Sequence, residues 1–210
     1  MKKAYFVGIA GGTASGKSTL CEKLEKVLGD FPAGGSADSG STGDNSPDEP
    51  KIKAVHMDKY FKPAKERPVA RSFVTGKMYS DYNHPQTVDM ERMKNDLEQL
   101  RYGEYDIVII EGLLTLWDDD IYAMLDLKLF IDCESDERIV RRINRNMQKG
   151  LTMDEITGVF LDMVRFRHNE YVEPSKWRAD IILNGSHTTD VSMSMITGYI
   201  KNNYKKQCSA

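Results

Sequence analysis

The stretch that decides the fold is Gly11-Gly12-Thr13-Ala14-Ser15-Gly16-Lys17-Ser18, which fits the phosphate-binding pattern G-x-x-x-x-G-K-S/T. An apolar run of strand length, residues 4–10, comes directly before it. Directly after it, apolar residues recur at helical spacing through residues 19–28, and Gly29 ends this run. Strand, glycine-rich turn and helix are the context that the pattern requires, so we predict a phosphate-binding loop at this position.

The residue types in this stretch suit a chain of nucleotide phosphates. Glycines let the backbone approach the phosphates, and the N-terminus of the following helix adds positive potential. Lys17 can place its charge on the β- and γ-phosphates, and the Ser18 hydroxyl can bind Mg²⁺. The alternative is a glycine-rich turn that fits the pattern by chance, which the flanking strand and helix disfavour. The predicted nucleotide-binding residues of the loop are Gly11, Gly12, Thr13, Ala14, Ser15, Gly16, Lys17, Ser18 and Thr19.

The overall composition is that of an ordinary globular chain. The 210 residues are 40% hydrophobic and 29% charged, with a net charge of −3 and a pI of about 5.9. This balance argues against a general binder of nucleic acid polymers or of membrane surfaces. The three cysteines, Cys21, Cys133 and Cys208, are scattered without metal-ligand spacing, which predicts free thiols in a reducing compartment. We therefore expect a cytoplasmic protein.

We predict one domain over residues 1–210, interrupted by a flexible loop at residues 30–50. That segment (DFPAGGSADSGSTGDNSPDEP) is rich in Gly, Ser, Pro and Asp and has almost no apolar residue. It therefore cannot bury enough surface to offset the entropy of ordering. A flap that covers the site is the alternative interpretation. No internal repeat and no second domain is visible in the sequence.

Five apolar runs and six helical patterns predict an α/β fold, a doubly wound parallel sheet of five strands with flanking helices. One further segment, residues 65–85, shows no periodicity and is predicted to be a long loop. The predicted strands are residues 4–10, 52–57, 106–110, 127–132 and 179–183. The predicted helices are residues 19–28, 87–102, 117–123, a helix capped by Ser135, residues 152–172 stopped by Pro174, and residues 191–204 with a frayed tail from Lys205 onward.

Acidic residues follow two of the predicted strands. Ligands of open α/β sheets bind beyond the carboxyl ends of the strands, which is where Asp58 and Glu111 fall. Asp58 could act as a general base toward a substrate hydroxyl, or it could cap a loop or pair with a lysine. Glu111 could act on Mg²⁺ or its waters, or it could be a carboxylate satisfied at a helix start.

Arginines gather on one face of the helix that follows Ser135. They lie at positions i, i+3, i+4 and i+7, and guanidinium groups match phosphate oxygens. A solvated face paired to nearby acids is the alternative. We predict an arginine-bearing helical lid around residues 135–150 that closes on the phosphates, with Arg141 and Arg145 as catalytic residues beside Lys17 and Arg142 as a nucleotide-binding residue. The four arginines are Arg138, Arg141, Arg142 and Arg145.

The ordered set of motifs resembles the uridine kinase-like P-loop kinases, which are related to phosphoribulokinase, pantothenate kinase and nicotinamide riboside kinases. The resemblance covers most of the chain outside residues 30–50. Besides the phosphate-binding loop, the matching stretches are Asp58-Lys59-Tyr60-Phe61, Asn83-His84-Pro85 with Asp89, Ile109-Ile110-Glu111-Gly112, Asp132 with residues 138–145, and Pro174-Ser175-Lys176 with residues 179–182.

The resemblance implies a P-loop NTPase-type fold and a role for each matching residue. Asp58 would take the proton from a sugar hydroxyl, and Glu111 with Ser18 would act in the Mg²⁺ shell. Arg141, Arg142 and Arg145 would lie near the phosphates, and His84 would lie in the nucleoside pocket. The predicted acceptor-binding residues are Asp58, Tyr60, Tyr82, Asn83 and His84, although Tyr82 could instead pack and His84 could be an exposed residue before a proline.

This sequence departs from the resemblance in the acceptor pocket. Uridine kinases have Asp where Asn83 stands, Arg-Gly-Arg-Asp where residues 149–152 read KGLT, and a pyrimidine-binding glutamine where Val159 stands. A segment with a base-contacting tyrosine is also absent between residues 89 and 106. Because these groups read the uracil ring, their loss argues against uridine as the preferred acceptor.

The sequence therefore predicts an ATP- and Mg²⁺-dependent kinase that phosphorylates a hydroxyl of a small molecule, most simply a nucleoside or other riboside. One alternative is a kinase of another small acceptor, such as a sugar phosphate or a pantothenate-like compound. Another is a non-catalytic ATP-binding switch or module. A GTPase switch is disfavoured because neither N-K-x-D nor a D-x-x-G after a strand is found. The sequence leaves open whether the chain forms a homo-oligomer.

Overall fold

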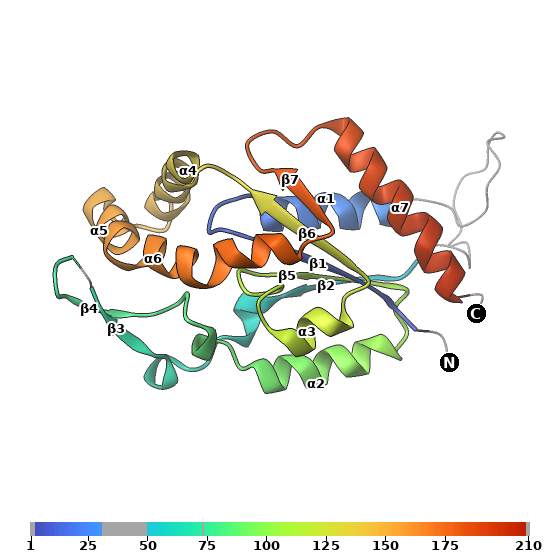
Figure 1. Cartoon of the computed structure of the whole chain (residues 1–210), viewed down its shortest axis with the longest axis horizontal. Coiled ribbons are helices and arrows are strands. Elements are labelled where there is room, and N and C mark those ends of the chain that lie inside the picture. The colour runs from blue at the N-terminus through green and yellow to red at the C-terminus, as the bar shows by residue number, and fades with distance from the viewer. Residues whose placement is uncertain (1–2, 31–49, 73, 209–210) are drawn as a thin grey trace.

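A computed structural model describes residues 3–30, 50–72 and 74–208. The predicted flexible loop at residues 30–50 falls almost entirely outside the described residues. Within them, no helix is long and apolar enough to cross a membrane. The termini of the described chain lie at the same end of the molecule (Figure 1).

A five-stranded parallel sheet forms the centre of the molecule, as the sequence predicts (Figure 1). Its strand order is β2-β5-β1-β6-β7, so β1 lies between β5 and β6. Strands β2 and β5 lie on one side of β1, and β6 and β7 lie on the other, which is the doubly wound arrangement. The carboxyl end of β1 thus lies at the switch point, where the strand order reverses. The strands are β1 (Tyr5–Gly11), β2 (Ile52–His56), β5 (Ile107–Glu111), β6 (Leu127–Asp132) and β7 (Ile181–Asn184).

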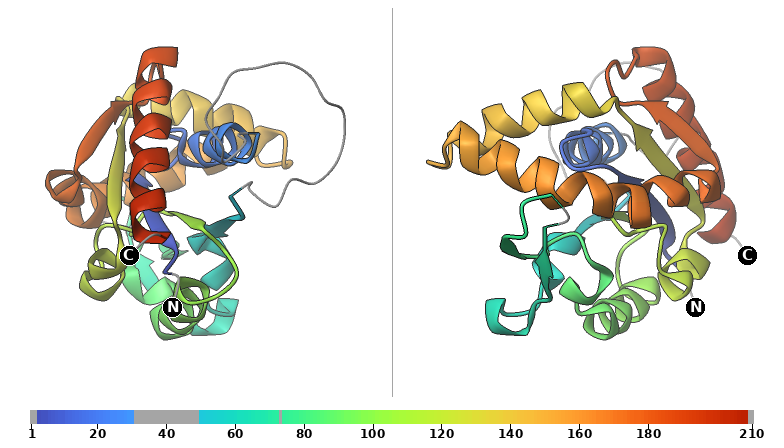
Figure 2. Two further views of the ribbon diagram at one scale, coloured as in Figure 1. Left: turned by 90° about the vertical axis from the view of Figure 1, so that its right-hand side faces the viewer. Right: turned by 60° about the vertical axis from the view of Figure 1, so that its left-hand side comes forward.

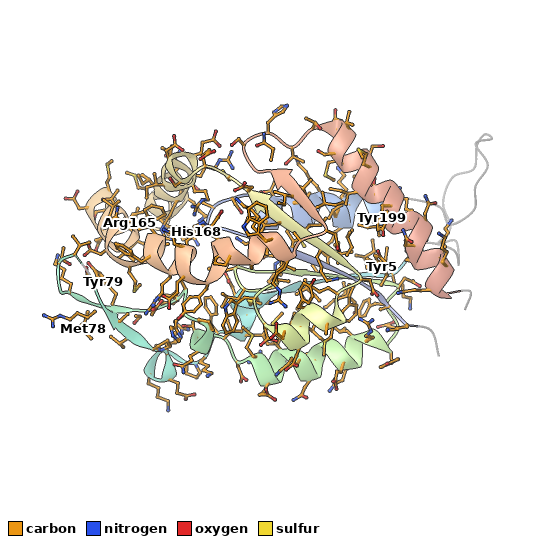
Figure 3. All side chains as sticks on the ribbon, viewed as in Figure 1. Tyr5, Met78, Tyr79, Arg165, His168 and Tyr199 are labelled. Carbon is orange, nitrogen blue, oxygen red and sulfur yellow. The ribbon has the colours of Figure 1, made fainter. Side chains whose placement is uncertain are left out.

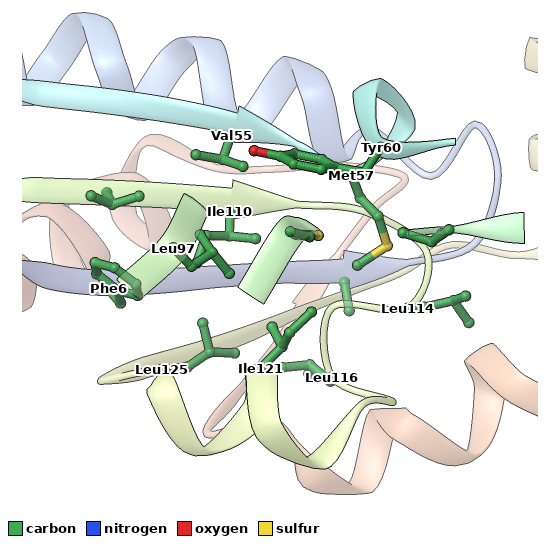
Figure 4. Packing of buried hydrophobic residues seen from close by; sticks show 14 of the residues in the cluster. Phe6, Val55, Met57, Tyr60, Leu97, Ile110, Leu114, Leu116, Ile121 and Leu125 are labelled. Carbon is green, nitrogen blue, oxygen red and sulfur yellow. The ribbon is translucent and has the colours of Figure 1, made fainter. Parts of the chain in front are cut away.

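Side chains alternate between the two faces of the sheet along each strand, and apolar side chains point to both faces. Helices therefore cover both faces. Phe6 and Ile110 face the cluster under α2 (Met90–Arg101) and α3 (Asp119–Met124) (Figure 4). Val7 and Ile109 face the opposite cluster, which is covered by α1 (Lys17–Gly29) and α7 (Asp190–Cys208). The central strands are buried along their whole length, which explains their continuous apolar sequence.

The segment predicted as a long loop, residues 65–85, contains an antiparallel hairpin instead. Its strands are β3 (Val69–Arg71) and β4 (Met78–Ser80), with Gly76 in the turn at a φ of 71°. Both strands are only three residues long, and Val69 and Met78 are exposed. The hairpin sequence therefore lacks the alternation of buried apolar and exposed polar residues that would indicate strands. The prediction of a structureless loop was wrong for this reason.

The helix predicted as a lid and the helix that follows it project together beyond the carboxyl ends of the strands, and we refer to them as the two lid segments (Figure 2). The first is α4 (Ser135–Met147), whose N-cap is Glu134 and not Ser135 as predicted. The second begins with a capping box between Thr152 and Glu155, as its sequence indicates. It runs continuously through α5 (Met153–Val159), the wide turns η4 (Phe160–Val164), α6 (Arg165–Arg167) and η5 (His168–Val172).

Several predicted boundaries differ from the structure. Helix α2 begins at Met90, because Asp89 accepts the N–H of Arg92 and caps it. The chain does not leave the helical path at Pro174 but continues as the 3-10 turn η6 (Glu173–Arg178). Helix α7 extends to Cys208, so the predicted frayed tail is helical. The remaining 3-10 turns are η1 (Met57–Tyr60), η2 (Ala64–Glu66) and η3 (Pro85–Thr87).

Candidate active site

The phosphate-binding loop joins the end of β1 to the start of α1 at the switch point of the sheet. Gly11 has a φ of 144°, and a Cβ there would stand 2.6 Å from the carbonyl oxygen of Ile131. Gly16 has a φ of 105° and precedes the first turn of α1. Lys17 is buried and its Nζ donates to the carbonyl oxygen of Gly12, 2.8 Å away. This backbone and charge arrangement is a ready site for an anion.

Glu111, at the end of β5, lies beside the loop. Its Oε1 accepts a hydrogen bond from Ser18 Oγ at 3.2 Å and lies 2.8 Å from His56 Nδ1. A hydroxyl and a carboxylate side by side next to a phosphate site suit Mg²⁺, which takes one or two protein oxygens together with phosphate oxygens and water. Accordingly, the described residues contain no cluster of three or more acidic, His or Cys side chains that could hold a metal alone.

Asp58 reaches the same cleft from η1, directly after β2. Its neighbour Met57 packs into the core (Figure 4), and Gly112 is required beside it because a Cβ there would stand 2.5 Å from that of Met57. Met57 thereby fixes η1 against the sheet and leaves Asp58 directed into the cleft. Asp58 remains accessible to solvent, and partial loss of water between the cleft walls, together with the nearby Glu111 carboxylate, raises the pKa of Asp58 above its ordinary value.

Burial also shifts the pKa of Lys17. The pKa of this ammonium group falls from 10.5 to about 8, because loss of water outweighs the attraction of Glu111 and Asp58. The protein therefore holds a cation that lacks sufficient negative charge around it. A nucleotide phosphate would supply that charge, so the loop fits the anion that the sequence predicts.

Two arginines of α4 add unpartnered donors around the loop. Arg142 donates from NH1 to Thr13 Oγ1 at 3.1 Å, while its buried Nε has no partner among the described residues. Arg138 is buried and packs over Gly12, where a Cβ would stand 2.6 Å from NH1 of the arginine. That NH1 atom also has no partner within the described part of the chain. Buried donors without acceptors are costly, so these two groups again fit a site that binds an anion.

The four arginines of α4 do not share one environment. Arg142 and Arg145 line the cleft with Lys17 and Asp58. Arg141, predicted as catalytic, lies outside the cleft lining and donates to the carbonyl oxygen of Gly185 at 2.9 Å and to Glu137 at 3.0 Å. No individual role was predicted for Arg138, because helical spacing alone does not distinguish which arginine of the face packs against the loop.

The cleft has a volume of about 470 Å³ and extends from the phosphate-binding loop to the second lid segment. Tyr82 and Asn83 lie in its lining, as predicted for acceptor-binding residues, and Asn83 is buried. Asn146 and Lys149 also line the cleft. Six further lining residues are apolar, and most of them are not among the predicted site residues. These residues are Phe61, Leu113, Leu151, Val159, Met163 and Val164.

Two predicted acceptor-binding residues lie elsewhere. Tyr60 is buried in the core, where its hydroxyl donates to Asp96 at 2.9 Å, and it lines a separate cleft between β2 and α2. His84 is absent from the lining of the main cleft. Its Nδ1 accepts the N–H of Gln86, and its ring meets that of Tyr171 at a centroid distance of 5.4 Å. In this arrangement, His84 shapes the turn that follows Asn83.

The parallel sheet with this phosphate-binding loop, the acidic residues at two strand ends and the arginine-bearing helix α4 are features of the P-loop kinase class. The Phosphoribulokinase / Uridine kinase family profile matches residues 6–192, and the chain belongs to this family. Uridine kinases of Clostridium botulinum are similar to it over almost their full length. The protein of strain Okra is 29% identical, with 98% of this chain and 100% of that protein covered. That of strain Kyoto is 30% identical, with 96% and 98% covered.

Two solved structures show the same fold. A chain described as a possible uridine kinase from Bacillus stearothermophilus superposes with a TM-score of 0.55 at 18% identity, covering 87% of this chain and 89% of that one. Shikimate kinase from Bacteroides thetaiotaomicron superposes with a TM-score of 0.50 at 13% identity, covering 96% and 98%. These likenesses concern the fold alone. The family makes the chain a nucleotide-binding kinase, and these two structures agree with its P-loop fold.

Proposed function

We propose that this protein transfers the γ-phosphoryl group of ATP to a hydroxyl of a small acceptor, which is a nucleoside or other riboside. The observation that carries the proposal is the convergence of Lys17, Asp58 and Arg145 on one cleft, with a phosphate site at one end and an apolar pocket at the other. A phosphoryl donor and an acceptor would meet between these ends. Positioning and charge stabilisation account for most of the catalysis in such transfers.

The residues divide the work according to their chemistry. Lys17 and Arg142 would hold the phosphates, and Arg145 would balance charge on the transferring group. Asp58 would accept the proton of the acceptor hydroxyl, a role that its raised pKa suits. Mg²⁺, held by Ser18 and Glu111 through oxygen or water, would neutralise charge on the phosphate oxygens when bound.

The wall of the acceptor end supports a ring-bearing acceptor. Phe61 and Tyr82 offer aromatic surface, and Met163 on the lid offers a polarisable apolar contact. Asn83 supplies a neutral amide, while Val159 cannot form a hydrogen bond to a base. Such a pocket favours an apolar or weakly polar ring attached to a ribose over uracil, whose polar edge would be left poorly paired.

A phosphorylated sugar is the second candidate acceptor. Lys149 lines the same cleft just after the end of α4, and its ammonium group could pair with a phosphate on the acceptor. The apolar wall does not complement such a ligand. We therefore consider a phosphorylated sugar a weaker candidate for the acceptor than a riboside.

An ADP-release assay with a panel of acceptors tests the proposal. The panel contains uridine, cytidine, nicotinamide riboside, purine ribosides, ribulose 5-phosphate and pantothenate, each with Mg-ATP. We expect one riboside to stimulate ADP release, and Lys17→Ala and Asp58→Asn to abolish the stimulation. Stimulation by ribulose 5-phosphate alone would favour the second candidate. If the protein binds ATP but no acceptor stimulates release, it is a nucleotide-binding module or acts on another class of acceptor.

A further inference from the structure

A buried ion pair joins the two walls of the acceptor end. Asp81 precedes the cleft residues Tyr82 and Asn83, and its side chain has no exposed surface. Arg167 lies 86 residues further on, in the second lid segment, and its side chain is 14% exposed. Arg167 Nε donates to Asp81 Oδ2 at 2.6 Å. Two segments that are distant in sequence are therefore held together by a charge-assisted bond in a place with little water.

Asp81 also determines the path of its own loop. Its Oδ1 accepts the backbone N–H of Asn83 at 3.1 Å, and its own N–H donates to the carbonyl oxygen of Pro68 at 2.8 Å. The hydroxyl of Thr87 donates to its backbone carbonyl oxygen. One carboxylate thus binds the lid segment with one oxygen and orients Asn83 with the other.

Arg167, the other member of the ion pair, lies on the helix that contributes apolar residues to the cleft wall. Val159, Met163 and Val164 project into the cleft from the turns that precede Arg167. The hairpin supports the same helix at a second point, where the hydroxyl of Tyr79 donates to Asp162 at 2.9 Å. Figure 3 shows Tyr79 close to the helix that carries Arg165 and His168.

We propose that Asp81 and Arg167 are positioning residues that set the distance between Asn83 and the apolar wall, and thereby determine how well the acceptor binds. The pair lies outside the cleft lining and acts through Asn83. Removal of one member of a buried ion pair leaves the other as an unpaired charge, which must find water or a new partner. The loop at Asn83 would then lose its fixed position, while the phosphate-binding loop would keep its own. The acceptor part of this inference rests on the proposed kinase function.

Kinetic constants of three variants test the link to the acceptor. Arg167→Met is expected to raise KM for the acceptor about tenfold, with kcat and KM for ATP changed by less than about twofold, because the lost interaction concerns acceptor binding alone. Arg167→Lys keeps the charge and should recover part of this loss. The matched control is Glu170→Gln, which removes the other, half-exposed partner of Arg167 and leaves Asp81 paired. It should behave as the unmodified protein.

Hydrogen exchange of the protein without ligands tests the positioning by itself. The amide of Asn83 is held by Asp81, so peptides spanning residues 81–86 should exchange faster in Arg167→Met and Arg167→Lys than in Glu170→Gln. Unchanged exchange would overturn the inference, as would faster exchange with an unchanged acceptor KM. If no acceptor is phosphorylated by the unmodified protein, the proposed function fails, and the exchange rates still decide whether the ion pair positions Asn83. Arg167→Lys, which keeps the buried charge, provides the comparison if Arg167→Met does not fold.

Discussion

Replacement of Lys17 by methionine should make the nucleotide-free protein more stable while it abolishes ATP binding. Lys17 is buried and its pKa falls from 10.5 to about 8, which means that the fold holds this charge at a cost. At 1.36 kcal/mol per pKa unit, the cost is about 3 kcal/mol at pH 7. The hydrogen bond from Lys17 to the carbonyl oxygen of Gly12 returns about 1 kcal/mol, which leaves a net gain of about 2 kcal/mol for Lys17→Met.

This gain depends on pH with a definite sign. Between pH 8 and pH 10.5 the unfolded chain binds more protons at Lys17 than the folded protein does, so the stability of the unmodified protein rises with pH across that window. Below pH 8 the full penalty is present. The advantage of Lys17→Met should therefore be constant below about pH 8 and should fall away as the pH approaches 10.5.

Thermal unfolding without nucleotide at pH 7 and pH 10 measures both effects. The expected increase in Tm at pH 7 is about 6 °C for a domain of this size. Lys23→Met is the matched control, because Lys23 is an exposed lysine of the same helix and its loss should change stability by less than about 0.5 kcal/mol. Equal or lower stability of Lys17→Met at pH 7 would refute the reasoning, because it would show that the folded protein compensates the charge.

Three further predictions concern the cleft. Asp58→Asn should lower kcat by about 10²- to 10⁴-fold; since the pKa of Asp58 is raised by its surroundings, kcat/KM of the unmodified protein should rise with pH through that pKa, and the pH–rate profile of the variant should lack this limb. Glu111→Gln should raise the Mg²⁺ concentration needed for half-maximal rate in a metal titration, and chelation of Mg²⁺ should stop transfer. Arg142→Met should weaken ATP binding by about tenfold or more in a titration, whereas Arg141→Met should change it little, because that side chain contacts Gly185 instead.

The sheet and the phosphate-binding loop could be predicted because their sequence signals are local. The strands of a buried parallel sheet are apolar on both faces, and the glycines and Lys17 occupy fixed spacings next to one of them. Asp58 and Glu111 could be placed for the same reason, since the carboxyl ends of parallel strands share one edge of the sheet. In each case a short segment carries the information by itself.

The rest of the site depends on packing between distant segments. Helical spacing puts four arginines on one face of α4, but it does not say that Arg138 packs on Gly12 while Arg141 turns toward Gly185. Tyr60 lies close to Asp58 in sequence, yet the hydrogen bond to Asp96 of α2 draws it away from the cleft. These positions are determined by tertiary contacts, so the periodicity of the sequence does not predict them.

The measurement that tests the central claim most directly is phosphorus NMR of a reaction with Mg-ATP and the acceptor that most stimulates ADP release. A kinase predicts a new phosphomonoester signal that grows as ATP declines and that is absent with Asp58→Asn. The cleft, with its phosphate site and apolar pocket, would then be the site of transfer between donor and acceptor. A signal of inorganic phosphate alone, or no change in ATP at all, would contradict the account, because the hydroxyl acceptor would not have received the phosphoryl group.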